Sequence, residues 1–243
     1  MVFFKAVPTD DGSYTVYSQQ RDECYHSISG AFYEARRLYI DESKVSEAFA
    51  SGSAVPVGVL DVGLGLGYNA LATIEAWAHM PAVCCELEVA SLECYVELIE
   101  ALASGESSWQ KNWPAEWVNF CRTLKQVSGN KWVGEIKHPQ ASHCCNWNIY
   151  LGDATKQYLP RPASGGKWDY IWQDPFSPKK NPDMWNENWF SKLRGGSSPS
   201  TQLLTYSCSR VVKDNLSVSG WDWSLIKAPG KKKNWLKAVI RPD

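Results

Sequence analysis

The sequence predicts an α/β fold built on a doubly wound, mostly parallel, seven-stranded sheet with helices on both faces. Apolar runs of strand length alternate along the chain with segments whose apolar residues recur at helical spacing, the order that builds parallel sheets. Residues 57–62, VGVLDV, are followed directly by a glycine-rich turn and a helical segment. Acidic residues stand near the ends of four predicted strands, where open sheets of this kind bind ligands. Together these three observations predict a Rossmann-like fold with a ligand site at one edge of its sheet.

The first half of the chain begins with a predicted β-rich extension, residues 1–50, that packs on the main domain, residues 51–243. Alternating apolar and polar residues predict short strands in this extension. The main domain then begins with two strand-helix units. The predicted elements are strands at 12–19, 31–40, 57–62 and 82–87, with helices at 68–80 and 90–104.

The second half begins with a predicted helical insertion at about 106–146, a segment that contains four tryptophans and little clear periodicity. The doubly wound pattern then resumes and ends in an antiparallel pair around a Pro-Gly turn. The predicted elements are strands at 146–154, 167–174 and 201–208, helices at 186–196 and 209–220, and two strands within 223–240.

The composition is that of a folded protein of 243 residues, long enough for a sizeable core. The sequence has no apolar run of about eighteen residues, so it predicts no membrane span. The apolar run among its first residues is too short for a secretory signal. The eight cysteines include two adjacent pairs, Cys84-Cys85 and Cys144-Cys145, which make poor structural disulfides. Reduced thiols in the cytoplasm are the expected state.

Charge is distributed unevenly along the chain, although the net charge is only −1. Residues 1–174 carry 13 Lys and Arg against 21 Asp and Glu, whereas residues 175–243 carry 12 against 5. A basic C-terminal third predicts a surface that meets something anionic, and a solvated charged surface is the alternative.

The turn after the strand at 57–62 contains Gly63, Gly65 and Gly67. Glycines at such a turn let a ligand approach the backbone, and the free N–H groups of the following helix favour an anionic group. The turn therefore predicts a nucleotide-type cofactor site, with a purely structural turn as the alternative. We include Asp61, before the turn, and Asn69, in the helix after it, in this predicted site.

Acids at the ends of the second and third strands extend the predicted cofactor site. Glu86 and Glu88 lie on the same face of the predicted strand at 82–87 and its end, so either could accept hydrogen bonds from a ribose; Glu88 is nearer the tip. Gly152 and Asp153 follow the third strand, where Asp153 is a partner for an adenine amino group. Surface acids without a ligand are the alternative in both cases.

Asp174 ends the fourth predicted strand and enters the turn DPFSPKKNP. Three prolines in this turn, Pro175, Pro178 and Pro182, are expected to hold the carboxylate rigidly. A positioned carboxylate is suited to orienting an amine and accepting its proton, and capping of the next helix is the structural alternative.

The sequence resembles a known family, the methyltransferase of tRNA 5-methylaminomethyl-2-thiouridine synthesis. The resemblance spans nearly the whole chain and is most specific in residues 174–185, DPFSPKKNPDMW. Its other elements are the glycine turn, ELEVASL, LGDA, the segment 17–40 with Glu34, Trp113-Pro114, TYSCSRVVKDNL and GKKKNWL. Pro175, where glycine is common, and Leu66, where a smaller residue is common, depart from the pattern.

The resemblance implies a class I S-adenosylmethionine-dependent methyltransferase that acts on the primary amine of 5-aminomethyl-2-thiouridine at the wobble position of tRNA. It implies Asp174 as the catalytic carboxylate and no metal. The residues expected to bind the substrate are Tyr25, Glu34, Phe176, Lys179, Lys180, Lys231, Lys232 and Lys233. Loop packing is the alternative for Tyr25, and a solvated loop is the alternative for Lys231, Lys232 and Lys233. Because the match fills the chain, an oxidoreductase acting earlier on the same tRNA is expected to be a separate protein.

Two other interpretations of the sequence remain open. The first is an S-adenosylmethionine-dependent enzyme acting on another amine, in nucleic acid, protein or a small molecule. The second is a non-catalytic nucleotide- or RNA-binding module, which would not need acids at four strand ends. The cluster His138, His143, Cys144 and Cys145 matches no zinc spacing, so we predict no metal site there.

Overall fold

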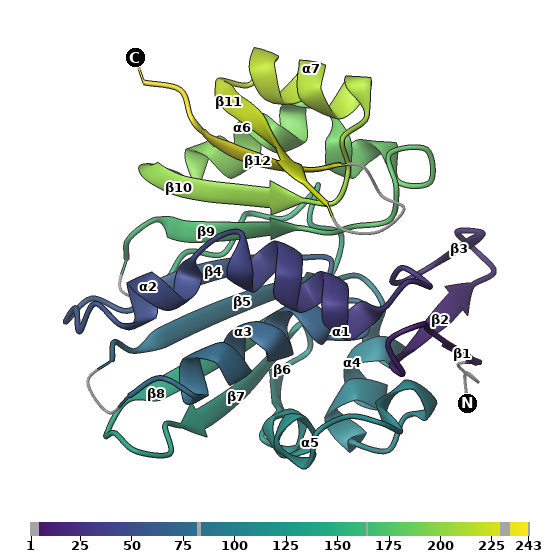
Figure 1. The fold of residues 1–243 in the computed structure, drawn as a ribbon, viewed down its shortest axis with the longest axis vertical. Helices are drawn as coiled ribbons and strands as arrows, with labels where there is room; N and C mark the ends of the chain where they lie inside the picture. Colours follow the sequence, from purple (N-terminus) through teal and green to yellow (C-terminus); the bar gives the residue numbers. More distant parts are fainter. Residues whose placement is uncertain (1–4, 82–83, 164, 229–233, 243) are drawn as a thin grey trace.

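The computed structural model describes residues 5–81, 84–163, 165–228 and 234–242. Among these residues it shows an α/β fold around a nine-stranded sheet of order β11-β12-β10-β9-β4-β5-β8-β7-β6 (Figure 1). A separate three-stranded sheet, β1-β2-β3, lies beside the edge at which the arrows of β9 and β10 end. The predicted doubly wound α/β class is confirmed, with two more strands than expected in the main sheet.

The strands of the main sheet fall into a parallel centre and antiparallel margins. The parallel centre is β4 (Val57–Val62), β5 (Leu87–Glu93), β8 (Cys144–Leu151), β9 (Trp168–Gln173) and β10 (Ser197–Thr205). The margins are β6 (Lys125–Ser128), β7 (Lys131–Lys137), β11 (Trp221–Lys227) and β12 (Asn234–Ile240). The small sheet is β1 (Ala6–Pro8), β2 (Tyr14–Ser18) and β3 (Glu23–Cys24).

The helices alternate with these strands and cover both faces of the sheet. In the first half they are α1 (Ala31–Glu34), the π-helical segment η1 (Ala35–Asp41), α2 (Val45–Phe49), α3 (Tyr68–Ala78) and α4 (Val96–Ser104). In the second half they are η2 (Ser108–Gln110), α5 (Ala115–Arg122), η3 (Pro182–Trp185), α6 (Glu187–Gly195) and α7 (Arg210–Val218).

The order in which the parallel strands are added creates a switch point between β4 and β9. From β4 the chain builds outward through β5 to β8, and it then crosses to β9 and β10 on the other side. Connections leave β4 and β9 in opposite directions, which opens a crevice outside their carboxyl ends. The glycine turn follows β4 and Asp174 follows β9, so both lie at this switch point.

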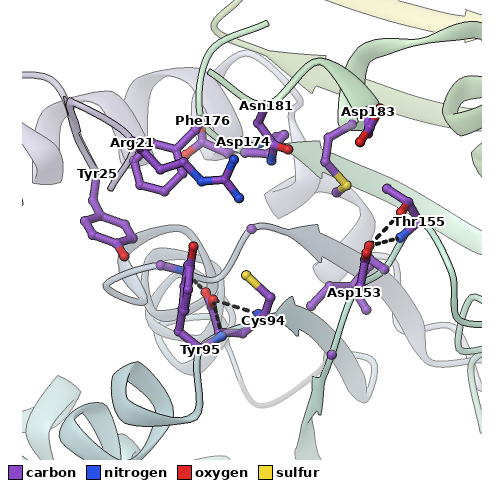
Figure 2. A pocket seen from close by; sticks show the side chains of 18 of the residues that line it. Arg21, Tyr25, Cys94, Tyr95, Asp153, Thr155, Asp174, Phe176, Asn181 and Asp183 are labelled. Carbon is purple, nitrogen blue, oxygen red and sulfur yellow. Dashed lines mark hydrogen bonds between the residues drawn. The ribbon is translucent and has the colours of Figure 1, made fainter. Parts of the chain in front are cut away.

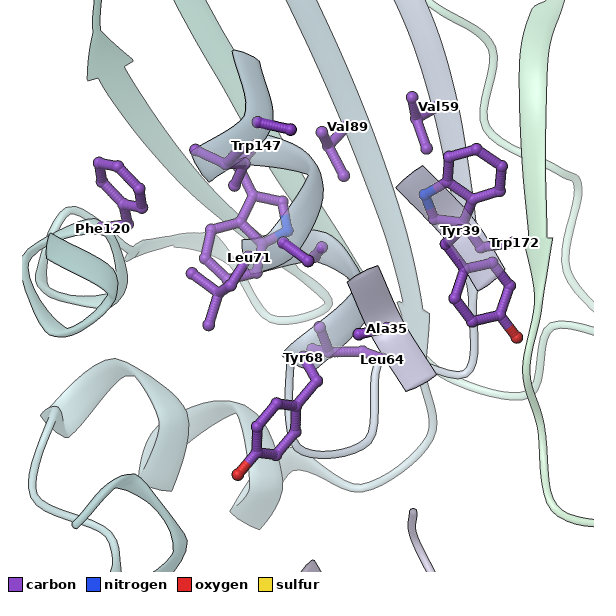
Figure 3. Packing of buried hydrophobic residues seen from close by; sticks show 14 of the residues in the cluster. Ala35, Tyr39, Val59, Leu64, Tyr68, Leu71, Val89, Phe120, Trp147 and Trp172 are labelled. Atoms are coloured by element: carbon purple, nitrogen blue, oxygen red, sulfur yellow. The ribbon is translucent and has the colours of Figure 1, made fainter. Parts of the chain in front are cut away.

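Alternating side chains of the parallel strands divide the interior into two cores. On one face Val59, Val89 and Trp172 pack with residues of η1 and α3; Figure 3 shows Tyr39 of η1 next to Trp172, with ring centroids 5.5 Å apart. On the other face, buried side chains of β4 and β5 pack with those of α6 and α7. Because both faces of the sheet are packed against helices, the ends of its strands are held in place at the switch point.

The prediction of a strand at 31–40 is wrong, because these residues form α1 and η1. Ala35, Leu38 and Tyr39 are buried against the sheet, a spacing that a helical segment presents on one side. The strand expected at 12–19 is present as β2. The extension is therefore a small sheet followed by helices; its division from the main domain at residue 50 stays a prediction.

The second parallel strand is also displaced from its predicted position. The sequence suggested a strand at 82–87 and a helix from residue 90, but β5 occupies Leu87–Glu93 and α4 begins at Val96. Every residue of β5 is buried, because β4 and β8 flank it and helices cover both its faces. Because the strand lies further along the sequence than predicted, a different acid stands at its carboxyl end.

The predicted helical insertion at 106–146 is only partly helical. The helices η2 and α5 are present, but β6 and β7 follow and extend the sheet beyond β8. In β7 the buried positions Trp132, Gly134 and Ile136 alternate with less buried ones, which is the period of a strand. At the other margin, the predicted antiparallel pair is confirmed as β11 and β12.

Two further findings concern the whole described chain. No helix within the described residues is long and apolar enough to cross a membrane. None of the eight cysteines, all of which lie in the described ranges, is joined in a disulfide.

Candidate active site

A cavity of about 300 Å³ opens at the switch point, and we call it the first cavity (Figure 2). Its lining comes from the glycine turn after β4, from the ends of β5, β8 and β9, and from the segment that follows β3. Of the residues predicted to bind a cofactor, the lining includes Gly63, Gly65, Gly152 and Asp153. The structure thus brings strand ends from across the parallel sheet to one cavity.

The glycine turn borders the first cavity through its first two glycines. Gly63 has a φ of 87°, and a Cβ there would lie 3.0 Å from the carbonyl oxygen of Asp174. That approach keeps the turn tight against the residue after β9 and favours glycine. Gly67 does not line the cavity; a Cβ there would lie 3.0 Å from Cδ1 of Leu102, so this glycine serves helix packing.

Glu93 is the acid at the carboxyl end of β5, and the sequence analysis did not find it. Its Oε2 accepts a hydrogen bond from the Gly65 N–H at 2.9 Å, and its Oε1 accepts from the N–H groups of Cys94 and Tyr95 at 2.7 and 3.0 Å. Burial raises the pKa of Glu93, and these backbone N–H groups oppose that rise. The carboxylate ties the glycine turn to the end of β5 and borders the first cavity.

Glu88, which we predicted at the tip of the second strand, lies at the opposite end of β5. It pairs in register with Gly58, near the start of β4, and its carboxylate oxygens accept from the Ala163 N–H at 2.7 and 2.8 Å. Glu86 precedes β5 at that same end. Neither residue lines the first cavity, whereas Glu93 does.

The third strand places its predicted residues as expected. Gly152 and Asp153 follow β8 and line the first cavity. Oδ1 of Asp153 accepts from the N–H and the hydroxyl of Thr155 at 3.0 and 2.6 Å, as Figure 2 shows. Oδ2 pairs with Lys156 at 2.9 Å. These contacts lower the pKa of Asp153, the Thr155 hydroxyl most, and keep it ionised.

Asp61, in β4, does not line the first cavity. Its side chain is fully buried and its Oδ2 accepts from the Ser91 hydroxyl at 2.8 Å, while its Oδ1 has no hydrogen-bond partner among the described residues. Burial raises the pKa of Asp61 to about 7. The predicted direct contact with a cofactor is therefore not seen in the lining of the first cavity.

A second cavity of about 340 Å³ adjoins the first. Five residues line both cavities, and we call them the dividing wall: Tyr25, His26, Asp174, Pro175 and Phe176. The second cavity is otherwise lined by Glu23, Glu34 and Tyr206 and by residues 24, 27 and 28. Three carboxyl groups, those of Glu23, Glu34 and Asp174, thus border it.

Asp174 occupies the centre of this arrangement. Its N–H donates to the carbonyl oxygen of Val62 at 3.0 Å, which fixes it beside the end of β4. Its Oδ2 accepts from Nδ2 of Asn69 at 2.6 Å. Burial raises the pKa of Asp174 to about 8, and the negative charge of Glu34 contributes to the rise. A carboxyl group with this pKa gains or loses a proton near neutral pH.

The turn after Asp174 is braced by hydrogen bonds in addition to its prolines. The carbonyl oxygen of Pro175 accepts from the Tyr206 hydroxyl at 2.9 Å, and that of Phe176 accepts from Trp185 Nε1 at 2.8 Å. Ser177 donates its N–H and its hydroxyl to Glu23 at 3.1 and 2.8 Å. The turn is therefore held by the residue after β10, by η3 and by β3.

The aromatic part of the dividing wall is formed by Tyr25 and Phe176, whose ring centroids lie 4.8 Å apart. The Arg21 guanidinium lies 6.0 Å from the Phe176 centroid and donates to the carbonyl oxygen of Lys180 at 2.9 Å. Burial lowers the pKa of His26 to about 4, so this side chain is neutral at physiological pH. The wall presents apolar rings around a single carboxyl group.

Of the lysines expected to bind the substrate, Lys179 and Lys180 lie among the described residues, and neither lines a cavity. Lys180 pairs with Asp22 at 2.9 Å, which gives it a role in joining the turn to the N-terminal segment. Lys179 is exposed on the same turn. Lys231, Lys232 and Lys233 lie outside the described residues. Within the described ranges, no group of three or more His, Cys, Asp or Glu side chains could hold a metal ion.

The fold and the site define the class of the protein: a doubly wound α/β protein with a glycine turn and strand-end acids around a switch-point cavity. The chain belongs to the family described as S-adenosyl-L-methionine-dependent methyltransferase, whose profile matches residues 116–241. S-adenosylmethionine is accordingly its cofactor. The first cavity fits this molecule, since bare glycine backbone and the carboxylates of Glu93 and Asp153 border it.

Curated relatives are named for tRNA modification. The chain is 28% identical over 239 residues to the tRNA 5-methylaminomethyl-2-thiouridine biosynthesis bifunctional protein MnmC of Cupriavidus necator, covering 93% of this chain and 33% of that protein. It is also 28% identical over 239 residues to the MnmC of Chromohalobacter salexigens, covering 95% of this chain and 32% of that protein. The chain thus spans about a third of the length of these relatives.

Among solved structures, the chain is similar to MNMC2 from Aquifex aeolicus. The TM-score is 0.76 at 23% sequence identity, and the match covers 100% of this chain and 73% of that one. At this identity the similarity shows the fold.

Proposed function

We propose that this methyltransferase acts on tRNA and converts the primary amine of 5-aminomethyl-2-thiouridine at the wobble position to a methylamine. The names of the curated relatives, which cite the biosynthesis of 5-methylaminomethyl-2-thiouridine, support this substrate. The observation on which the proposal rests is the place of Asp174 in the dividing wall, because one carboxyl group there faces both cavities.

In this proposal the first cavity holds the cofactor and the second admits the amine. S-adenosylmethionine supplies an electrophilic methyl group on a positively charged sulfur. The amine arrives mostly as an ammonium ion, and the three carboxyl groups around the second cavity favour a cation there. His26 adds no opposing charge, since its lowered pKa keeps it neutral.

Asp174 then serves as the general base. It accepts one proton from the ammonium group, and the nitrogen lone pair attacks the methyl carbon as the carbon–sulfur bond breaks. The products are a methylated amine, S-adenosylhomocysteine and a proton on Asp174 that later passes to solvent. A positioned base of this kind contributes on the order of 10²–10⁴-fold to the rate.

Glu93 and Asp153 take the ribose and the adenine amino group in this proposal, and Tyr25 and Phe176 flank the acceptor. The reaction takes place in the cytoplasm with tRNA, and another enzyme supplies the aminomethyl group beforehand. Methylation of an amine elsewhere, in another nucleic acid, a protein or a small molecule, is the alternative that the test below separates.

The test is a single-turnover assay on tRNA that carries the unmethylated aminomethyl group, followed by mass spectrometry of its nucleosides. The wild-type protein should form 5-methylaminomethyl-2-thiouridine. Asp174→Asn keeps the shape of the side chain but cannot accept the proton, so its rate should fall by at least ~10²-fold.

Affinity for S-adenosylhomocysteine, measured by calorimetry, serves as the control and should change little in Asp174→Asn. A wild-type protein that leaves this nucleoside unmethylated would refute the proposed substrate. A rate for Asp174→Asn within about threefold of wild type at neutral pH would refute the role of Asp174.

A further inference from the structure

We infer that Asn69 is a positioning residue whose side-chain amide holds the Asp174 carboxyl group in the dividing wall. This role differs from the cofactor contact that the sequence predicts for Asn69. The inference rests on the proposed function, since it concerns the carboxyl group that receives the proton.

The position of Asn69 separates it from the cofactor. It lies in the first turn of α3, is only 3% exposed, and is not among the residues that line the first cavity. Its Nδ2 instead lies 2.6 Å from Oδ2 of Asp174, a charge-assisted hydrogen bond when that carboxyl group is ionised. Because an ionised carboxylate can only accept, the amide nitrogen must face it.

The backbone around Asn69 fixes the direction of this amide. Asn69 is two residues after Gly67, and its carbonyl oxygen accepts from the Thr73 hydroxyl at 2.8 Å. Thr73 in turn accepts from Trp172 Nε1 at 3.0 Å, which ties α3 to β9 just before Asp174. The segment that begins with the glycines of the first cavity therefore also orients the base.

Most other groups around Asp174 are acidic or aromatic. The groups that face it are Glu34 from α1, Tyr39 from η1, Asp61 from β4, Tyr206 after β10, and Glu23, Tyr25 and His26 from the N-terminal segment. Glu34 and Asp61 disfavour a negative charge on Asp174, whereas Asn69 and Tyr39 favour it. Asn69 donates to the carboxylate and, unlike Glu23 and Glu34, does not line the second cavity.

The expected effect of removing this amide is a shift in pH dependence. Since the Asn69 N–H group stabilises ionised Asp174, its loss raises the pKa of Asp174, and the base becomes available only at higher pH. The acid limb of the single-turnover profile should move up by about one pH unit in Asn69→Ala, which is about tenfold in rate below the limb. The deficit should shrink as the pH rises past the new limb.

The experiment compares wild type with Asn69→Ala, Asn69→Ser and Asp174→Asn, and with the double variant Asn69→Ala/Asp174→Asn. Asn112→Ala is the matched control, since Asn112 donates its amide to the carbonyl oxygen of Gly12 at 2.8 Å away from both cavities. Each variant is tested for methyl transfer to the aminomethyl-tRNA across pH and for affinity for S-adenosylhomocysteine. Asn69→Ser retains a short donor and should show a smaller shift than Asn69→Ala; it also serves if the alanine variant does not fold.

Two results would support the inference. The acid limb shifts in the Asn69 variants while their cofactor affinity stays within about twofold of wild type, and the double variant is no slower than Asp174→Asn. Non-additivity of this kind marks residues that act through one another. An unshifted limb, additive losses, or weaker cofactor binding without a shift would overturn it.

These outcomes are distinct from failure of the proposed function. If wild type does not methylate this tRNA, the proposed substrate is wrong, and the binding data on the Asn69 variants still decide whether Asn69 contacts the cofactor.

Discussion

At the scale of single residues, the site depends on which side chain ends each strand. Glu93 and Glu88 are five positions apart on one strand, yet only Glu93 reaches the first cavity. Both are buried acids with backbone N–H partners, so burial alone would not separate them. The direction of the parallel strand separates them, because ligands bind at its carboxyl end.

Substitution of these two glutamates tests the assignment. Glu93→Gln should weaken binding of S-adenosylhomocysteine by roughly 1–3 kcal/mol, the range for losing a charged hydrogen-bond partner. Glu88→Gln, a matched change at the other end of β5, should leave that affinity unchanged. Isothermal titration calorimetry of both variants measures the difference, and equal losses would return Glu88 to the predicted cofactor site.

At the scale of elements, the residues in and around β3 and the turn after β9 form one unit. Glu23 accepts both the N–H and the hydroxyl of Ser177, while Lys180 pairs with Asp22. The Tyr25–Phe176 ring pair of the dividing wall joins the same two segments. The N-terminal segment around β3 therefore contributes to the lining of both cavities.

This coupling predicts a cost for removing Glu23. Glu23→Ala leaves Ser177 without its carboxylate partner and should lower the free energy of unfolding by about 1–2 kcal/mol, since the pair is partly buried. Glu47→Ala is the control: its pair with Lys44 has side chains 75% and 70% exposed at 3.8 Å, and such pairs contribute little. Denaturant unfolding should show a lower free energy of unfolding for Glu23→Ala than for Glu47→Ala, and methyl transfer should slow only in Glu23→Ala. Indistinguishable unfolding curves would argue against a stabilising contact between Glu23 and Ser177.

The sequence predicted the elements whose signals are local and missed those that depend on neighbours. The glycine turn, the strand that leads to Asp174 and the antiparallel pair β11 and β12 each carry their own signal, and all are present. The local sequence predicts the end of a strand and the start of a helix within residues 87–93. In the structure these residues form one strand, and their burial on both faces depends on distant segments. The hydrogen bonds from Asn69 to Asp174 and from Ser177 to Glu23 span 105 and 154 positions, and only the fold reveals them.

At the scale of the whole molecule, charge and topology follow the same division. The acidic residues 1–174 build the N-terminal sheet and the sheet from β9 to β6, whereas the basic residues 175–243 build β10, β11, β12 and the helices beside them. Tyr206 of the second cavity belongs to this basic part, and two residues later the thiol of Cys208 donates to the carbonyl oxygen of Asn234 at 3.1 Å. Asn234 directly follows Lys231, Lys232 and Lys233 in the sequence.

The charge division predicts how tRNA binding depends on salt. If Lys231, Lys232 and Lys233 meet phosphates, each contact releases condensed counterions, and binding weakens steeply as salt is added. Replacing all three by alanine should flatten the slope of log affinity against log salt by about 2, given ~0.7–0.9 for each phosphate contact. The control removes the same charge elsewhere, by substituting the exposed Lys111, Lys125 and Lys137, and should flatten the slope much less. Fluorescence anisotropy with labelled tRNA over a range of salt concentrations gives both slopes, and cofactor affinity should stay the same in all variants. If the two triple variants flatten the slope equally, net charge alone drives the attraction and these three lysines are not a phosphate-binding site.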